Sequence, residues 1–448
     1  MSRLTINNPK PRGPQKSPST WYRYYPCFSE NFAQSVLTSA KLTKEQWVLD
    51  PWNGSGTTTS NACSLGLNTY GFDLNPVMIL IAKARDLDFA EYPSVQPLLA
   101  EVVRKARKTF DVDPLDPLLT WLVPNSVSYF RSIEAAIQKL LVDEKCYLTL
   151  NKRGLQAISD LAAFFYLALF RTLKRFLKPF VASNPTWVKR PKHHMARLRP
   201  DGVDARATFR SEVEQMLKLP AKTEKIGTPG KRLLAVASSE SLPLPDGTID
   251  FALSSPPYCT RIDYAVATSI ELAALGQPLG PEFEALRRQL IGNTTVPKTE
   301  GAASQQLGPT CLKFLEKLSK HAAKASSTYY YKNHIQYFRS IAQSLSELSR
   351  VLKLEGRCIL VVQDSFYKDL HNDLPKMVIE MAHRCSLELS DRFDFPLSRT
   401  MAGINPRVSE YRDSFAALET VIVLDRTQGI RSSDNVAAKP VVRPSLES

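Results

Sequence analysis

Short apolar runs that alternate with helical patterns are the feature that most limits how this chain can fold. Buried strands are expected over residues 47–49, 69–72, 249–253, 358–362 and 420–424. Helices are expected over about 76–84 and about 334–352, and the second carries six apolar residues on one face, Ile335, Phe338, Ile341, Leu345, Leu348 and Val351. This alternation predicts an α/β fold in which a mostly parallel sheet is covered by helices on both sides.

Two stretches interrupt the alternation and indicate inserted helical segments. Residues from about 91 to 230 are mostly helical in composition, and residues from about 276 to 328 form a second, partly polar helical stretch. The α/β core is therefore expected over 21–90 and 231–426, with the smaller insertion inside its second part. Residues 1–20 and 427–448 are rich in Pro, Ser and other polar residues, which predicts flexible tails.

The charge of the chain points to its partners. Its 448 residues include 58 Lys and Arg against 44 Asp and Glu, a formal net charge of +14. This surplus favours a polyanionic partner, nucleic acid or a membrane surface, and a soluble cationic enzyme is the alternative. The longest apolar run, 161–170, is too short to cross a bilayer, and the first twenty residues lack the apolar stretch of a secretory signal.

Cysteine and histidine usage argues against metal sites. The seven cysteines are scattered and never spaced as Cys-x-x-Cys, which disfavours both a disulfide framework and a zinc site. The adjacent pair His193-His194 has no Cys or carboxylate cluster beside it. We therefore predict a soluble cytoplasmic protein with no metal and no membrane partner.

The strongest local signal is a strand that ends in an acid and runs through a Gly-rich turn into a helix. It reads Val48-Leu49-Asp50-Pro51-Trp52-Asn53-Gly54-Ser55-Gly56-Thr57-Thr58. Glycines permit tight turning and close approach of a ligand to the backbone, and the free N–H groups of a helix start attract negative groups. The turn lacks the Gly-Lys-Ser/Thr of a phosphate loop and departs from Gly-x-Gly-x-x-Gly, which disfavours a nicotinamide cofactor.

A second acid follows the next predicted strand. Asp73 ends the run Tyr70-Gly71-Phe72 and precedes Leu74-Asn75-Pro76. A carboxylate in this position can accept hydrogen bonds from both hydroxyls of a ribose. Two acids at successive strand ends suit a ligand with a ribose and an amino acid moiety, which describes S-adenosylmethionine. The alternative is a plain tight connection between strand and helix.

A later strand, over 249–253, runs into Ser254-Ser255-Pro256-Pro257-Tyr258. The proline carbonyls and the Ser255 hydroxyl can turn towards one guest, an arrangement that suits the two hydrogens of an exocyclic amino group. Accepting those hydrogens frees the nitrogen lone pair to attack a methyl sulfonium. Tyr258 offers a flat face on which an extruded base can stack. Alone, this tetrapeptide is usually a strand terminator, but its pairing with the first turn makes coincidence less plausible.

These segments resemble the DNA methyltransferases that methylate exocyclic amino groups, producing N4-methylcytosine or N6-methyladenine. Asp50 to Thr58 is similar to their DPFxGSGTT cofactor motif with Trp52 in place of Phe, and Ser255 to Tyr258 resembles their catalytic tetrapeptide in its cytosine-N4 form. Segment 21–29 resembles the element that closes over the methionine end of the cofactor, and Arg350 to Gly356 resembles the turn written RVLKPGG. The resemblance covers about 21–90, 231–275 and 330–425.

The resemblance implies a Rossmann-like methyltransferase fold and a set of site residues. The catalytic residues would be Ser255, Pro256, Pro257 and Tyr258. Those binding S-adenosylmethionine would be Tyr25, Phe28, Asp50, Pro51, Asn53, Gly54, Ser55, Gly56, Thr57, Thr58, Asp73, Asn75 and Pro76. One departure matters, because the family often has Gly-Asp-Ser/Ala before Leu-Pro-Leu, with the acid facing the cofactor's adenine. Here Ser238 or Ser239 takes that role or the contact is lost.

A basic stretch in the large insertion is the candidate nucleic-acid surface. Nine Lys and Arg and no acid lie between residues 171 and 199, with Phe176, Phe180 and Trp187 interleaved. Phosphate contacts dominate affinity for nucleic acids, and aromatic rings can stack on bases. A solvated helix face is the alternative. The candidates for DNA contact are Arg171, Lys174, Arg175, Lys178, Lys189, Arg190 and Lys192.

The sequence thus predicts an S-adenosylmethionine-dependent DNA methyltransferase, with cytosine N4 favoured over adenine N6, of the restriction-modification kind and with a possible cognate restriction nuclease. The large insertion, 91–230, would find the target sequence. The alternatives are an RNA amino-methyltransferase and a catalytically silent DNA-binding module. Beyond the catalytic turn, Arg261, Asp263 and Tyr264 either shape the base pocket or include a plain Arg–Asp pair. Asp364 lies at the expected ligand edge without an assigned role.

Overall fold

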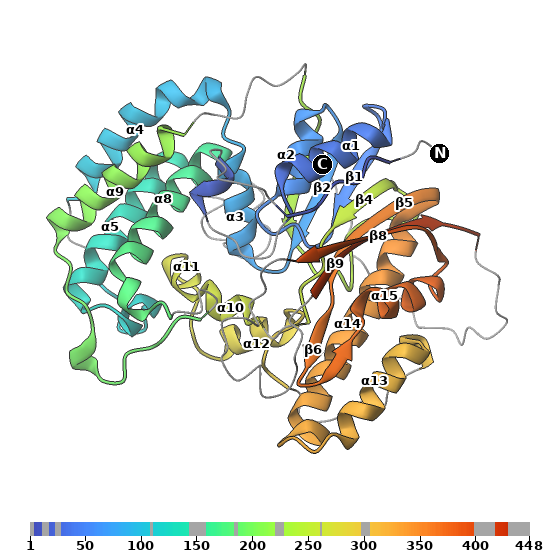
Figure 1. The fold of residues 1–448 in the computed structure, drawn as a ribbon. Coiled ribbons are helices and arrows are strands. Elements are labelled where there is room, and N and C mark those ends of the chain that lie inside the picture. The colour runs from blue at the N-terminus through green and yellow to red at the C-terminus, as the bar shows by residue number, and fades with distance from the viewer. Residues whose placement is uncertain are drawn as a thin grey trace.

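The computed structural model describes residues 4–10, 18–22, 28–107, 111–142, 158–182, 187–219, 228–259, 262–296, 305–397 and 417–428. Its centre is a seven-stranded sheet in the order β3-β2-β1-β4-β5-β9-β8 (Figure 1). The strands are β1 Trp47–Asp50, β2 Asn68–Asp73, β3 Arg232–Val236, β4 Ile249–Ser254, β5 Leu352–Gln363, β8 Leu387–Leu397 and β9 Ala417–Arg426. Two short strands, β6 Ser365–Tyr367 and β7 Leu370–Asn372, form a separate hairpin.

Strand direction in the sheet fixes where a ligand can bind. β3, β2, β1, β4 and β5 are mutually parallel, whereas β9 runs antiparallel to both β5 and β8. In the register, Asp50 lies beside Gly71, and Leu49 beside Ala252. The carboxyl ends of β1, β2 and β4 therefore meet at one edge, where ligands of open α/β sheets bind.

Successive residues of each central strand point to opposite faces of the sheet, and each face has its own helices. Val48 packs in a cluster with the helices α1 Glu30–Ala40 and α2 Thr57–Ser64. Leu49 packs in another cluster, with α13 Pro309–Lys320, α14 Tyr331–Val351 and α15 Leu374–His383. Because both faces are buried, the central strands are continuous apolar runs, which made them recognisable in the sequence.

A layer of helices lies beyond α3 Pro76–Arg85 (Figure 1). It contains α4 Tyr92–Lys105, α5 Pro124–Leu141, α8 Asp160–Phe176 and α9 Gly202–Leu217. The apolar run 161–170 forms the amino-terminal part of α8, and it is buried together with α3 in one cluster. A helix that is apolar on all sides needs neighbours all round, and here α3 and the other helices provide them. Within the part of the chain described, no helix is long and apolar enough to cross a membrane.

The smaller insertion and the amino-terminal residues pack against the core. After β4 come α10 Tyr264–Ala267, α11 Ser269–Ala274 and α12 Pro281–Gln289. The sequence predicts a flexible tail over 1–20, but Leu4 and Ile6 pack against the cluster around α1, and the Ser29 amide donates to the Pro9 carbonyl at 2.7 Å. These two apolar side chains therefore anchor the described segment 4–10 to the core.

Candidate active site at the carboxyl edge of the sheet

The Gly-rich turn after β1 is fixed between its two neighbouring strands. The Asn53 amide donates to the Phe72 carbonyl at 2.9 Å, and Thr58 Oγ1 donates to the Leu253 carbonyl at 2.9 Å. Gly56 has φ +83°, and a Cβ there would lie 2.8 Å from the Cβ of Ala82. Because only glycine combines that backbone conformation with that space, the turn keeps its shape and α2 begins directly after it at Thr57.

Arg85, which the sequence did not single out, braces this turn from the end of α3. Its buried guanidinium donates to the carbonyl and the hydroxyl of Ser55 at 2.5 and 2.7 Å and pairs with Glu30 at 3.0 Å. A bidentate guanidinium holds its acceptors in a fixed plane. The only available sequence signal was a basic residue in the last turn of a helix, which is too common to be diagnostic.

The two acids of the site have different surroundings. Asp50 is 3% exposed and accepts hydrogen bonds from the Ser254 hydroxyl and, at 3.2 Å, from the Trp52 amide, so it ties β1 to β4. Burial raises the pKa of Asp50 to about 6, although these hydrogen bonds act to lower it. Asp50 is not part of the cavity wall described below.

Asp73 is the acid that reaches the cavity. Its carboxylate accepts from the Gly54 amide at 3.0 Å and from the Asn75 amide at 2.8 Å. Burial, and to a smaller extent the nearby Asp50, raise the pKa of Asp73 to about 7 against these two hydrogen bonds. Since each carboxylate oxygen has two lone pairs, Asp73 keeps acceptor capacity for a ligand after both amides are bound.

Asn75 and Pro76 start α3 in the way their residue types favour. The Asn75 side-chain oxygen accepts from the Val77 amide at 3.1 Å, and Pro76 takes the first helical position, where no N–H is needed. The Asn75 amide group also donates to Thr268 Oγ1 at 2.9 Å. This hydrogen bond joins the residues that follow β2 to the segment that follows β4.

The Ser-Pro-Pro-Tyr segment after β4 is held from two sides. Ser255 Oγ donates to the Val361 carbonyl of β5 at 2.9 Å, and the Tyr337 hydroxyl of α14 donates to the Pro257 carbonyl at 2.8 Å. Tyr258 is 7% exposed, and its hydroxyl accepts from Lys10 Nζ at 3.1 Å. Lys10 in turn pairs with the buried Glu419 of β9 at 2.9 Å. Neither Lys10 nor Glu419 was a candidate from the sequence.

One cavity brings the two sequence motifs together. It has an empty volume of about 660 Å³, part of it open to solvent. The predicted site residues on its wall are Pro51, Asp73, Asn75, Ser255, Pro256 and Pro257. The wall also contains Trp52, Leu74, Met78, Ala237, Ser238, Ser239, Tyr264, Gln289, Leu290 and Ile291. Ser255 and the turn after β1 therefore lie on the same side of the core.

The other predicted cofactor residues that the structure describes are not on the wall of this cavity. Asn53, Gly54, Ser55, Gly56, Thr57 and Thr58 form the turn and the helix start next to it. Phe28 is buried in the cluster around α1, where its ring packs on Phe32 with centroids 5.3 Å apart. Tyr25 lies outside the described residues, as does Arg261.

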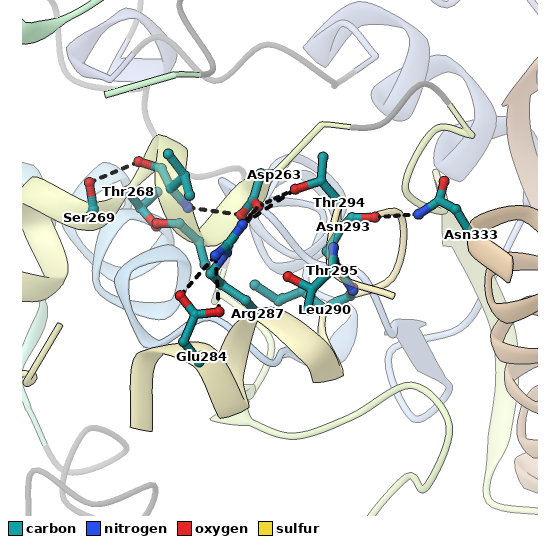
Figure 2. Close-up of polar contacts among 12 residues, drawn as sticks. Asp263, Thr268, Ser269, Glu284, Arg287, Leu290, Asn293, Thr294, Thr295 and Asn333 are labelled. Carbon is teal, nitrogen blue, oxygen red and sulfur yellow. Dashed lines mark hydrogen bonds and ion pairs between the residues drawn. The ribbon is translucent and has the colours of Figure 1, made fainter. Parts of the chain in front are cut away.

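The smaller insertion supplies part of the wall, and Figure 2 shows the polar network that holds it. Asp263, which is almost completely buried, accepts from both Arg287 Nε and Nη2, at 3.0 and 2.7 Å, and from the Thr294 hydroxyl at 2.9 Å. Asn333 of α14 donates to the Asn293 carbonyl at 2.8 Å. These bonds fix the segment 287–294, whose residues Gln289, Leu290 and Ile291 face the cavity. Asp263 thus pairs with Arg287, whereas Arg261, the partner considered from the sequence, lies outside the described residues.

The predicted nucleic-acid residues divide into two groups. On α8, Arg171 and Arg175 pair with Glu212 of α9 at 2.7 and 3.0 Å, and Lys174 pairs with the fully buried Glu271 of α11 at 2.5 Å. Lys178, Lys189 and Lys192 are exposed, and no carboxylate partner is found for them among the described residues. Arg190, also exposed, donates to the Leu279 carbonyl at 3.4 Å. Periodicity alone did not predict the ion pairs to Glu212 and Glu271.

No group of three or more His, Cys, Asp or Glu side chains with metal-binding geometry occurs within the described ranges. Asp364 accepts from the Leu418 amide at 2.8 Å and contacts His371 Nε2 at 2.9 Å. Together these bonds join the start of β9 to the β6–β7 hairpin. Asp364 therefore has a structural role at this edge.

Comparison with known proteins gives one curated relative and several distant structures. The relative is the type II methyltransferase M.BsoBI of Geobacillus stearothermophilus, 23% identical over 280 residues, which are 57% of this chain and 52% of the relative. The chain therefore matches about half the length of that protein. No family model matches the chain.

Two solved structures are similar over most of the chain but with low scores. An S-adenosylmethionine-dependent methyltransferase from Methanosarcina mazei is 10% identical, with a TM-score of 0.31, over 88% of this chain and 98% of that protein. The YcgJ protein from Bacillus subtilis is also 10% identical, with a TM-score of 0.31, over 89% of this chain and all of that protein. Both are too distant to support an argument about function.

Proposed function

We propose that this chain, whose fold is the Rossmann-like fold of S-adenosylmethionine-dependent methyltransferases, is a DNA methyltransferase that methylates the exocyclic amino group of a flipped base. The observation that carries the proposal is the shared cavity: Asp73 and Ser255 belong to motifs far apart in the sequence and line the same wall. The similarity to a type II methyltransferase supports the same function.

The cavity and the turn beside it fit S-adenosylmethionine. Asp73 keeps lone pairs for the ribose hydroxyls, and the backbone of the Gly54–Gly56 turn beside it would lie close to the methionine part. The start of α2 at Thr57 offers free amides to a carboxylate. When bound, the cofactor supplies an electrophilic methyl group on a sulfonium.

Ser255 is proposed to orient the amino group of the target base. Its hydroxyl donates its hydrogen to the Val361 carbonyl, so the lone pairs of the Ser255 oxygen remain available to accept from a donor. Accepting an N–H there, together with the Pro256 carbonyl, would draw the amino nitrogen out of conjugation with the ring and direct its lone pair towards the methyl group. Tyr258 would stack on the extruded base, with its hydroxyl held by Lys10.

Cytosine N4 is the favoured position, because the tetrapeptide begins with serine, as in the cytosine-N4 enzymes that it resembles. Adenine N6 and an RNA amino group are the alternatives. The exposed residues Lys178, Lys189, Arg190 and Lys192 would contact the DNA backbone. A role in restriction and modification, with a possible cognate nuclease, belongs to the same proposal and is supported only by the similarity to a type II methyltransferase, not by any residue of this chain.

The test is methylation by the purified full-length protein with methyl-labelled S-adenosylmethionine and unmethylated genomic DNA, in parallel with tRNA. Digestion to nucleosides and mass spectrometry identify the product. Label in N4-methylcytosine is expected. Label only in N6-methyladenine would refute the cytosine assignment, and label only in tRNA would refute the DNA assignment. Binding of DNA without any methyl transfer would indicate that the protein is a catalytically silent DNA-binding module.

A further inference from the structure

The amino-terminal segment, residues 4–10, places a cation at the Ser-Pro-Pro-Tyr segment. Lys10 Nζ lies 3.1 Å from the Tyr258 hydroxyl oxygen and 2.9 Å from Oε1 of Glu419. It is 5.6 Å from the centre of the Tyr258 ring, so it contacts the hydroxyl end of this side chain. The fold brings Lys10 and Tyr258 together across 248 residues of sequence, and Tyr258 and Glu419 across 161.

The backbone around Lys10 is fixed by bonds of its own. The Lys10 amide donates to the Asn8 side-chain oxygen at 2.9 Å, and the Asn7 side chain donates to Ser35 Oγ of α1 at 3.0 Å. Together with the apolar contacts of the same segment, these bonds hold it against α1. The position of Lys10 at the site is therefore set by the packing of this segment.

Glu419 anchors the ammonium of Lys10 to the sheet. It lies beside Gln363 of β5 in the register, and its side chain is 1% exposed. Burial acts to lower the pKa of Lys10, but the Tyr258 hydroxyl and the Glu419 carboxylate outweigh it and raise that pKa above its ordinary value. Lys10 is therefore charged at neutral pH, and a charged donor makes a hydrogen bond about twice as strong as a neutral one.

The Tyr258 hydroxyl is held in both of its hydrogen-bonding roles. Its oxygen accepts from Lys10, and it donates to Glu419 Oε1 at 3.4 Å. The backbone next to the ring is held as well, because the Tyr337 hydroxyl donates to the Pro257 carbonyl. A ring that is fixed at its backbone and at its hydroxyl keeps one plane, which is the condition for stacking on a flat base.

We propose that Lys10 is a positioning residue for methyl transfer, which together with Glu419 fixes the plane of the Tyr258 ring against the target base. The inference rests on the proposed function, because it takes an extruded base as the partner of Tyr258. Neither Lys10 nor Glu419 is on the wall of the cavity, so their role concerns the base and not the cofactor. The alternative is an ion pair that only stabilises the fold.

The experiment measures single-turnover methyl transfer to saturating unmethylated genomic DNA by the full-length protein and its Lys10→Met variant. Methionine has no charge and no donor, so the rate is expected to fall about tenfold through misplacement of the ring. The Kd for S-adenosylhomocysteine, measured by calorimetry, is expected to stay unchanged. Lys10→Arg keeps a charged donor and is expected to recover most of the rate. An unchanged rate in Lys10→Met would overturn the proposal.

Tyr258→Phe tests whether Lys10 acts through the hydroxyl. This variant keeps the ring and lacks the hydroxyl, so adding Lys10→Met to it is expected to lower the rate no further. A tenfold loss in both backgrounds would show that Lys10 acts by another route, and the proposal would be wrong.

Two controls separate positioning from stability. The double variant Lys10→Met and Glu419→Gln leaves no buried carboxylate without its cation, so it is expected to melt near the wild-type temperature while its rate stays low. Recovery of the rate in this variant would make the pair purely structural and overturn the proposal.

Lys353→Met is the matched control. Lys353 pairs with Asp250 at 2.7 Å where β4 and β5 begin, at the opposite edge of the sheet from the cavity. Its rate is expected to equal that of the wild type, and a tenfold loss there would show that the effect of Lys10→Met is not specific to the site. Absence of methyl transfer by the wild type to any nucleic acid would refute the proposed function, and this inference with it.

Discussion

Cofactor affinity is expected to rise with pH through neutrality, because the role proposed for Asp73, accepting both ribose hydroxyls, requires its ionised form. Burial raises the pKa of Asp73 to about 7, so the carboxyl is mostly protonated at pH 6 and mostly ionised at pH 8. If only the ionised form binds fully, the Kd for S-adenosylhomocysteine falls about tenfold from pH 6 to pH 8, the ratio of the ionised fractions for a pKa near 7. The direction follows from the raised pKa, since a group of ordinary pKa would already be ionised at pH 6.

Calorimetry at pH 6, 7 and 8 and constant ionic strength measures this slope. The Asp73→Asn variant is the control: it has no titrating carboxyl, so it is expected to bind more weakly and without the tenfold change. Asp50 has a pKa of about 6 but does not reach the cavity, so it is not expected to produce the change centred at pH 7. A slope of the same size in Asp73→Asn would assign the titration to another group. Affinity that falls with pH would refute the role given to Asp73.

Three further predictions concern Ser255 and the basic residues. Ser255→Ala is expected to lower the single-turnover rate of methyl transfer to DNA by about a hundredfold while the Kd for S-adenosylhomocysteine stays the same, and an unchanged rate would exclude Ser255 from the chemistry. Lys174→Met leaves the buried Glu271 without its cation and is expected to cost about 3 kcal/mol of stability, measured by denaturant unfolding. The double variant Lys189→Gln and Lys192→Gln is expected to keep its stability but to reduce the slope of log Kd for DNA against log salt concentration by about 2. If instead Lys174→Met reduced this slope and the double variant lost stability, the structural role and the DNA-binding role would be exchanged between these residues.

The fold class was predictable because the central strands are buried on both faces. All five predicted runs lie inside strands of the sheet, since the parts of β5 and β9 that were predicted, 358–362 and 420–424, are buried at every position. The edge strands β3 and β8 were not predicted. Most side chains of β8 are partly or fully exposed, and it includes Ser, Asp and Arg, so its sequence shows no buried run. The α/β class with a mostly parallel sheet is confirmed.

The site was predictable only where the residues that form it are adjacent in one short segment of the sequence. The turn after β1 and the tetrapeptide after β4 have turn residues and polar groups next to each other in the sequence, and topology then brings them to one edge. Three other parts come from distant segments: Arg85 behind the turn, Lys10 on Tyr258, and the wall at 289–291. Periodicity reports which face of an element is buried but not what covers it, so these partners had no local signal.

The basic stretch shows the same limit and suggests how DNA would approach. Helical spacing places Arg171, Lys174 and Arg175 close together, but all three side chains pair with buried acids, Glu212 of α9 and Glu271 of α11. Trp187, 42% exposed, and the cations from Lys189 onward remain at the surface. Arg190 contacts the carbonyl just before α12, and α12 ends at the cavity wall. A duplex held along 187–199 would therefore lie beside the cavity, whereas one held on α8 would have to compete with the ion pairs to Glu212 and Glu271.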